Sequence, residues 1–133
     1  MPESDLSSAP RGRILVAEDE PHIRRILVTI LEAGGFQVDQ AGDGTEAVAS
    51  LSGDTPYQLA LLDIMMPGFT GLEILEKVLP LPHRKDLPVL VLTAKGQDAD
   101  REAAFRLGAR DFVTKPFSPK KLFARINQIL DAP

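Results

Sequence analysis

Five residues of this 133-residue chain carry side chains that together could do phosphoryl chemistry. They are Glu18, Asp19, Asp63, Thr93 and Lys115, and each follows or ends a short apolar run. Carboxylates held close together repel one another unless a cation joins them, and a hard divalent ion such as Mg²⁺ binds carboxylate, water and phosphate oxygens. A carboxylate can also attack phosphorus while an ammonium and a hydroxyl group bind the remaining phosphoryl oxygens. The five residue types therefore match an Mg²⁺-assisted phosphoryl transfer to a carboxylate.

Short apolar runs predict the strands that would position these residues. Leu59–Leu62 and Val89–Leu92 are continuously apolar, which is typical of strands buried on both faces of a parallel sheet. The five expected strands lie at residues 14–17, 36–38, 57–62, 89–92 and 112–113. Because the functional crevice of such a sheet lies beyond the carboxyl ends of its strands, we expect the five side chains to meet at one edge.

Helical patterns separate the predicted strands. Apolar residues at helical spacing over Ile23–Leu31 predict a helix that ends at Gly34-Gly35. Capping boxes at Asp43–Glu46 and Thr70–Glu73 predict the starts of two more, an Ala-rich stretch around Gln97–Leu107 predicts a fourth, and Ser118-Pro119 predicts the start of the fifth. Five strand–helix units predict an α/β fold, with a doubly wound parallel sheet and right-handed crossovers.

Composition excludes several other classes of function. Fifteen basic and 19 acidic residues give a net charge of −4, which argues against a nucleic-acid-binding domain. The chain has no cysteine and two histidines, His22 and His83, so thiolate, His-rich zinc and serine–histidine sites are not expected. No apolar run could span a membrane and no signal peptide is evident. We expect a cytoplasmic protein with a disordered tail at residues 1–12 and one domain at 13–131.

Four segments resemble the receiver domain of two-component response regulators. They are Ile14–Glu20 (ILVAEDE), Leu61–Glu73 (LLDIMMPGFTGLE), Val91–Gly96 (VLTAKG) and Asp111–Ser118 (DFVTKPFS), in an order that covers Arg13 to Leu130. The resemblance implies a flavodoxin-like sheet of five parallel strands in the order 2-1-3-4-5 with five helices. It also implies a phosphoacceptor switch that catalyses only its own phosphorylation and slow dephosphorylation, and not a multiple-turnover enzyme.

The resemblance assigns roles to the candidate residues. Glu18 and Asp19, with Asp63 and the backbone carbonyl of Met65, would hold Mg²⁺. Asp63 would accept the phosphoryl group from a phosphohistidine of a sensor histidine kinase or phosphotransfer protein, which would dock on the helix at Pro21–Leu31. Thr93 and Lys115 would contact the phosphoryl oxygens, and the Lys115-Pro116 peptide bond is expected to be cis.

The resemblance further implies a switch and an interaction face. Phosphorylation would draw Thr93 inward and Phe112 would follow, which reshapes the face of the fourth helix, fifth strand and fifth helix. A plain core role for Phe112 is the alternative. The side chains of Met65 and Lys95 would orient water poorly, which predicts slow dephosphorylation.

A homodimer through that face is a further expectation. The second half of the chain resembles receivers attached to winged-helix transcription factors, and Asp111 and Arg125 match one of their cross-dimer ion pairs. Arg101 and Lys121 are both basic where that subfamily pairs a base with an acid, which weakens the expected dimer. The chain is expected to act alone or as part of a longer regulator, without binding nucleic acid or membrane itself.

Two enzyme-like or nucleotide-binding alternatives compete with this interpretation. Gly42–Ala47 fits G-x-G-x-x-A, and Asp63 follows about 20 residues later, as in a dinucleotide-binding fold. That motif follows the second strand, however, and leaves Glu18, Thr93 and Lys115 without a role. A phosphatase with Asp63 as nucleophile would need an acid two residues later, where Met65 stands.

Overall fold

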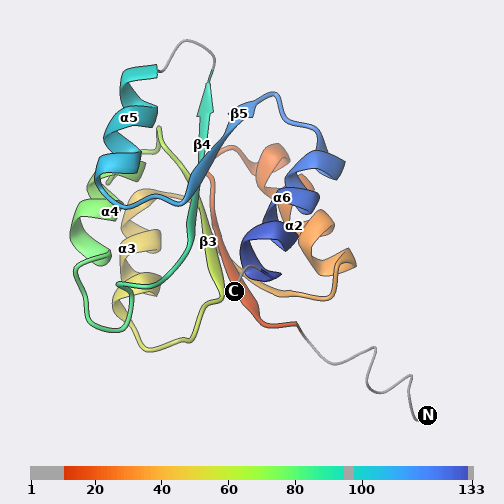
Figure 1. The fold of residues 1–133 in the computed structure, drawn as a ribbon, viewed down its shortest axis with the longest axis horizontal. Helices are drawn as coiled ribbons and strands as arrows, with labels where there is room; N and C mark the ends of the chain where they lie inside the picture. Colours follow the sequence, from red (N-terminus) through yellow and green to blue (C-terminus); the bar gives the residue numbers. More distant parts are fainter. Residues whose placement is uncertain (1–10, 95–97, 132–133) are drawn as a thin grey trace.

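A computed structural model gives the structure of residues 11–94 and 98–131. Within these residues, five parallel strands alternate with five helices, as Figure 1 shows. The strands are β1 (Arg13–Ala17), β2 (Gln37–Ala41), β3 (Leu59–Asp63), β4 (Val89–Ala94) and β5 (Asp111–Lys115). The helices are α2 (Pro21–Ala33), α3 (Gly44–Ser52), α4 (Gly71–Val78), α5 (Asp98–Arg106) and α6 (Pro119–Asp131). The strand order is β2-β1-β3-β4-β5, which confirms the predicted fold and topology.

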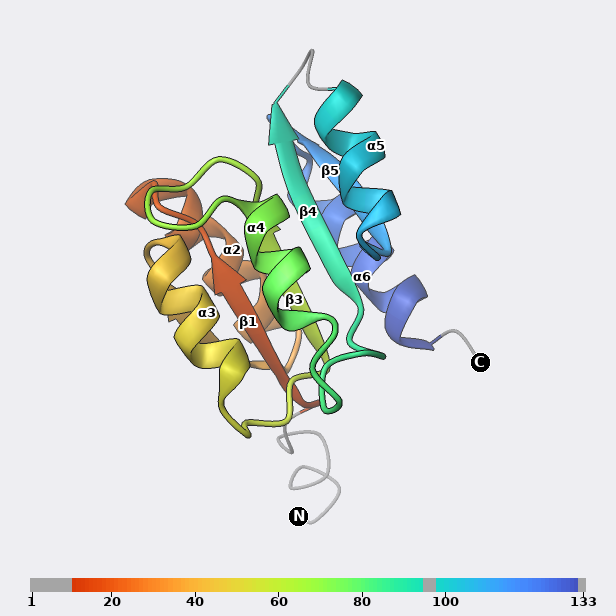
Figure 2. The same ribbon diagram turned by 90° about the vertical axis from the view of Figure 1, so that its left-hand side faces the viewer.

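The helices cover both faces of the sheet. Helices α3, α4 and α5 lie on one face, which is turned toward the viewer in Figure 2, and α2 and α6 lie on the other. Successive strand residues point to opposite faces, so Leu15 and Leu62 join the core under α3 and α4, while Ile14 and Leu61 join the core under α2 and α6. The central strand β3 is buried along its whole length, as its apolar run predicted.

The strand register brings the polar ends of the strands level with one another. Ala17 pairs with Leu62 across β1 and β3, and Asp63 pairs with Leu92 across β3 and β4. Thr93 then pairs with Thr114, one residue before Lys115 in β5. Because all strands are parallel, the residues that end or follow β1, β3, β4 and β5 share one edge of the sheet.

Some boundaries differ from the sequence-based expectation. Strand β2 runs from Gln37 to Ala41 instead of 36–38, because it is an edge strand whose polar residues are exposed or partly buried and give no apolar run. One of them, Asp39, pairs with Arg13 of β1 at 2.5 Å. Phe36, expected in the strand, is instead a buried core residue just before it.

The helix starts follow the predicted caps, with one difference and one addition. Thr70 and Glu73 form a full capping box, and Asp43 accepts a hydrogen bond from the amide of Glu46. The Glu46 carboxylate, however, accepts from the amide of Gly42 at 2.6 Å, one residue before the cap. Glu20 caps α2 by accepting hydrogen bonds from the amides of His22 and Ile23, a role the sequence analysis did not assign.

Arg11 and Gly12, which the sequence places in the tail, contact the folded domain. The amide of Arg11 donates to the carbonyl of Gly35 at 2.9 Å, and its guanidinium lies 4.5 Å from the ring centre of Phe36. The carbonyl of Gly12 accepts from the amide of Gln37. The rest of the predicted tail, residues 1–10, lies outside the described residues. Across residues 11–94 and 98–131, no helix has the length and apolar character needed to cross a bilayer.

Candidate functional site

Asp63 ends the central strand and lies next to two groups from other strands. The residue is 5% exposed, and its Oδ2 atom accepts a hydrogen bond from the Lys115 ammonium at 3.0 Å. The same ammonium lies 2.7 Å from Oε1 of Glu18, which follows β1. Because β4 separates β3 from β5 in the sheet, the Lys115 side chain passes over the end of β4 to reach both acids. The expected convergence of these three residues is therefore present.

Glu18 is fully buried, which has an electrostatic consequence. The pKa of Glu18 is raised to about 7, because burial, together with the neighbouring Asp63, outweighs the lowering by Lys115 and by the amide of Glu20. That amide donates to Oε2 of Glu18 at 3.1 Å. A carboxylate in this position favours an additional positive charge beside it.

Lys115 remains a cation in this environment. Burial lowers the pKa of Lys115, but its hydrogen bonds to Glu18 and Asp63 outweigh the burial, and the pKa is raised above its ordinary value. One ammonium thus neutralises only part of the charge of two carboxylates.

The three acids meet the requirements of a hard cation. One carboxylate oxygen each from Glu18, Asp19 and Asp63 can lie within 4.8 Å of the other two, and Asp19 is exposed to solvent. An all-oxygen donor set with an open side suits an ion that keeps several water molecules, such as Mg²⁺. Met65 donates its amide hydrogen to Oδ1 of Asp63 at 3.2 Å, and the residue is 59% exposed.

Thr93 supplies a buried hydroxyl group at the same edge. The residue is 1% exposed, and its Oγ1 atom has no hydrogen-bond partner among the described residues. A buried hydroxyl without a partner is costly, and such a group is a candidate for bonding to a ligand. Thr93 stands one residue beyond Leu92, the partner of Asp63 in the sheet register.

Phe112 lies half-buried on β5, between the core and the surface. Its ring meets the ring of Phe105 edge-on, with the centres 5.7 Å apart, and the Arg101 guanidinium lies 4.8 Å from its centre. Arg101 also pairs with Asp98 and donates to the hydroxyl of Thr114 at 3.4 Å. The predicted switch aromatic therefore packs between an apolar and a charged neighbour from α5.

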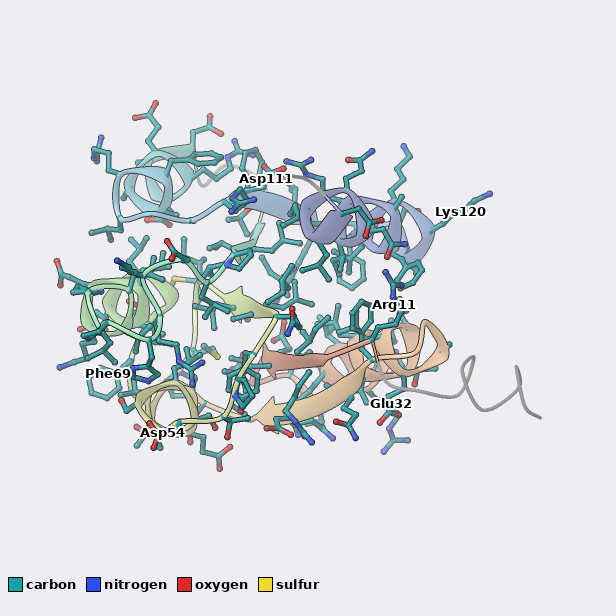
Figure 3. The ribbon with its side chains drawn as sticks, turned by 60° about the horizontal axis from the view of Figure 1, so that its bottom comes forward. Arg11, Glu32, Asp54, Phe69, Asp111 and Lys120 are labelled. Atoms are coloured by element: carbon teal, nitrogen blue, oxygen red, sulfur yellow. The ribbon has the colours of Figure 1, made fainter. Side chains whose placement is uncertain are left out.

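Two of the residues expected in a dimer contact, Asp111 and Arg125, pair with each other within one chain. The Arg125 guanidinium lies 2.5 Å from Oδ2 of Asp111, which Figure 3 labels on β5. Lys121 is exposed on α6. Lys95, expected to tune dephosphorylation, lies outside the described residues. The predicted cis peptide bond between Lys115 and Pro116 is present.

Arg24 is a residue near the site that the sequence analysis did not single out. Its Nη1 atom donates to the backbone carbonyl of Glu18 at 2.8 Å, and its Nε atom donates to Gln40 at 3.3 Å. Arg24 thereby ties the acidic loop to the end of β2. Its place one helical turn after Glu20 was the available signal, since a first-turn side chain can fold back over the loop before a helix.

Comparisons with known proteins agree with the fold. A family model, the response regulator receiver domain, matches residues 14–127. The chain is 44% identical over 118 residues to the phosphate regulon transcriptional regulatory protein PhoB of Klebsiella pneumoniae, a match that covers 89% of this chain and 51% of PhoB. It is 40% identical over 118 residues to the transcriptional regulatory protein ResD of Bacillus subtilis, with 89% and 48% covered.

Solved structures give the same result. A CheY-like response regulator receiver domain protein from Methanospirillum hungatei has a TM-score of 0.84 at 30% identity, over 90% of this chain and 94% of that one. The chemotaxis response regulator CheY4 of Vibrio cholerae has a TM-score of 0.83 at 27% identity, over 89% and 98%. The chain belongs to the receiver domains of two-component response regulators. It spans about half the length of the transcriptional regulatory proteins named above.

Proposed function

We propose that this chain is a cytoplasmic switch that accepts a phosphoryl group on Asp63 from a phosphohistidine of a sensor histidine kinase or phosphotransfer protein. The observation that carries the proposal is the contact of Lys115 with the buried acids Asp63 and Glu18, beside a Thr93 hydroxyl that has no hydrogen-bond partner among the described residues. Membership in the receiver family supports the same chemistry.

The three acids fit Mg²⁺, which we propose as the cofactor. Glu18, Asp19 and Asp63 would hold it with carboxylate oxygens, and Met65 would contribute its backbone carbonyl. When bound, Mg²⁺ supplies positive charge that offsets the negative charge of the phosphoryl oxygens. The buried Glu18 carboxylate, whose pKa burial raises to about 7, is the group that such a charge would stabilise most.

The transfer itself uses three side chains. A carboxylate oxygen of Asp63 forms a bond to phosphorus, the bond between phosphorus and the imidazole nitrogen breaks, and its electron pair stays on that nitrogen. The Lys115 ammonium, already 3.0 Å from Asp63, binds a negatively charged phosphoryl oxygen as the phosphoryl group becomes attached to the Asp63 oxygen. Thr93 donates its hydroxyl hydrogen to another phosphoryl oxygen, which gives the buried hydroxyl a partner that it does not have among the described residues.

The same site would return slowly to its unphosphorylated state. In dephosphorylation a water oxygen attacks phosphorus, the bond to Asp63 breaks and phosphate leaves. Met65 offers that water no polar side-chain atom beyond a weakly accepting sulfur. The chain would therefore catalyse only its own phosphorylation and slow dephosphorylation.

The output of the switch would be a change on the face of α5, β5 and α6. When Thr93 moves to bind the phosphoryl group, it vacates space toward β5, and Phe112 would move inward from its contacts with Phe105 and Arg101. The resulting surface would serve a partner protein or a second copy of the chain.

Intact-mass measurement after incubation with Mg²⁺ and acetyl phosphate tests the proposal. We expect one phosphoryl adduct on the wild type, none on Asp63→Asn and none when the metal is chelated. Asp54→Asn is a matched control, because Asp54 is an exposed acid at the far end of α3 (Figure 3). Absence of an adduct on the folded wild type, or an adduct that survives in Asp63→Asn, would overturn the assignment.

A further inference from the structure

A close backbone contact joins the start of α3 to residues 64–70, the loop that follows Asp63. The buried Gly44 donates its amide hydrogen to the carbonyl of Pro67 at 2.9 Å. A Cβ atom at Gly44 would lie 2.6 Å from the carbonyl carbon of Phe69 and closer still to its oxygen and nitrogen. These are backbone atoms, which cannot rotate away as a side chain could, so only glycine fits at this position.

A second glycine, Gly68 in the loop, makes a similarly close contact with Thr45 at the start of α3. Gly68 has a φ of +86°, which favours glycine, and a Cβ there would lie 2.6 Å from Oγ1 and 3.1 Å from the amide nitrogen of Thr45. Each segment thus places a glycine against the other. We call the four residues Gly44, Thr45, Gly68 and Phe69 the glycine interlock; Figure 3 shows Phe69 beside α3 and α4.

The other end of the loop is held just as closely. The amide of Gly71 donates to the carbonyl of Ile64 at 2.9 Å, and a Cβ at Gly71 would lie 2.9 Å from the carbonyl oxygen of Asp63. Met65 therefore stands in a short segment fixed at both ends. Its amide hydrogen bonds to Oδ1 of Asp63, so the backbone position of Met65 helps set the orientation of that carboxylate.

We propose that Gly44 is a positioning residue for the phosphoacceptor site. The interlock fixes the backbone of residues 64–70, and through Met65 it fixes the Asp63 carboxylate and the carbonyl expected to bind Mg²⁺. This inference rests on the proposed function. It also gives the G-x-G-x-x-A pattern at Gly42–Ala47 a purpose other than nucleotide binding, because the atoms that approach Gly44 closely belong to Phe69.

Gly44→Ala tests the proposal, with Gly53→Ala as its matched control. Within residues 11–94 and 98–131, a Cβ at Gly53 would meet nothing nearer than 3.7 Å, so this second glycine-to-alanine change, at the opposite end of the same helix, displaces no described backbone. We expect Gly44→Ala to weaken Mg²⁺ binding about tenfold, a typical loss when a group that supports metal ligands is disturbed. Calorimetric titration with Mg²⁺ alone measures this affinity, and Gly53→Ala should match the wild type. A wild-type Mg²⁺ affinity in Gly44→Ala would overturn the proposal.

Amide hydrogen exchange on the wild-type chain gives a second test that needs no variant and so decides the matter if Gly44→Ala does not fold. If the interlock and the metal ligands are coupled, Mg²⁺ should slow exchange at Gly44, which bonds to Pro67. The amide of Phe36, bonded to the carbonyl of Leu31, is the internal control. Equal exchange at Gly44 with and without Mg²⁺ would contradict the coupling.

The outcomes separate this inference from the function on which it rests. If the wild-type chain binds no Mg²⁺ and takes up no phosphoryl group, the proposed function is contradicted. If the wild-type chain binds Mg²⁺ and takes up a phosphoryl group, and Gly44→Ala has the same Mg²⁺ affinity, only the positioning role of Gly44 is contradicted.

Discussion

The ammonium of Lys115 lies 2.7 Å from a carboxylate oxygen of Glu18, a residue with no exposed surface. One cation therefore serves two buried or nearly buried acids, because the same ammonium bonds to Asp63 at 3.0 Å. The arrangement leaves an excess of negative charge in a place of low polarity. A site organised in this way is less stable than its surroundings and is suited to receive a positive ion.

Replacing Glu18 by Gln should stabilise the metal-free protein. The pKa of Glu18 is raised to about 7, so its ionised form is less stable in the folded protein than in the unfolded chain. Removal of this charge should therefore raise the free energy of unfolding by about 1 kcal/mol. The same change should remove most of the stabilisation that Mg²⁺ gives. Thermal unfolding with chelator and with Mg²⁺ measures both effects. A Glu18→Gln protein less stable than the wild type in chelator would contradict this interpretation.

Tyr57 provides a titration that reports on the opposite end of the sheet. Burial and a hydrogen bond from its hydroxyl group to Oδ2 of Asp39, at 2.7 Å, raise the pKa of Tyr57 to about 12. It is the only tyrosine and the chain has no tryptophan, so the tyrosinate absorbance follows this residue alone. We expect a midpoint well above the ordinary 10.0, and a lower midpoint in Asp39→Asn than in the Asp54→Asn control.

The same shift fixes the sign of a stability change at alkaline pH. Because the folded pKa exceeds the unfolded one, the contribution of Tyr57 to stability is complete below about pH 10 and is lost as the pH rises through about 12. Denaturant unfolding at a series of alkaline pH values should therefore show a smaller decline for Tyr57→Phe than for the wild type. Parallel declines in the two proteins would show that Tyr57 is not responsible.

Arg84 should be important for stability although it is far from the phosphoacceptor site. It is 2% exposed, and its guanidinium donates to the carbonyls of Leu51 and Gly53, at the end of α3, at 2.8 and 3.0 Å. It also lies 5.1 Å from the ring centre of Tyr57. Arg84→Met would leave these carbonyls with fewer donors and should cost about 2 kcal/mol of unfolding free energy. Lys85→Met, a change at the exposed neighbouring position, should cost far less in the same denaturant titration.

Met65→Asn should shorten the lifetime of the phosphorylated state. A carboxamide can bond to the attacking water where the thioether cannot, and one such hydrogen bond in the transition state corresponds to about a tenfold faster loss of phosphate. Because Met65 is 59% exposed, the fold should not change. The decay of the phosphoryl adduct by mass spectrometry measures the lifetime. Met65→Leu is the control, and equal lifetimes for all three proteins would rule out this role for position 65.

Dimerisation through α5, β5 and α6 should depend on charge. Arg101 and Lys121 are both basic, and like charges across an interface weaken it, so the phosphorylated chain should associate more at high salt than at low salt. Lys121→Glu should strengthen association, whereas Lys120→Glu, at the neighbouring exposed position that Figure 3 labels, should have little effect. Equilibrium sedimentation measures the oligomeric state, and a monomer under every condition would argue for a different protein partner.

The sequence predicted those parts of the molecule that produce a local pattern. Asp63 and Thr93 could be placed at the ends of strands, because a continuous apolar run, typical of a buried strand, precedes each of them. The capping box at Thr70 was evident for the same reason, since all of its members lie within four residues.

Features that depend on distant residues could not be predicted. The carbonyl partners of Arg84 lie 31 and 33 residues earlier in the chain, and nothing near Arg84 marks it as buried. The apolar pattern misplaces strand β2, because an edge strand buries little side-chain surface and needs no alternation of apolar residues. Glu20 could have been identified as a helix cap, because an acid directly before a proline and an amphipathic stretch is a recognised start signal.

The alternation of β3 between two cores has a genetic consequence. Leu61 belongs to the layer under α2 and α6 and Leu62 to the layer under α3 and α4, and Asp63 follows both. A modification at Asp63 therefore acts on a strand that both layers hold in place. Second-site substitutions that restore signalling to a variant impaired near Asp63 should arise in helices on both sides of the sheet. A genetic selection for such suppressors would identify the residues that respond to phosphorylation of Asp63.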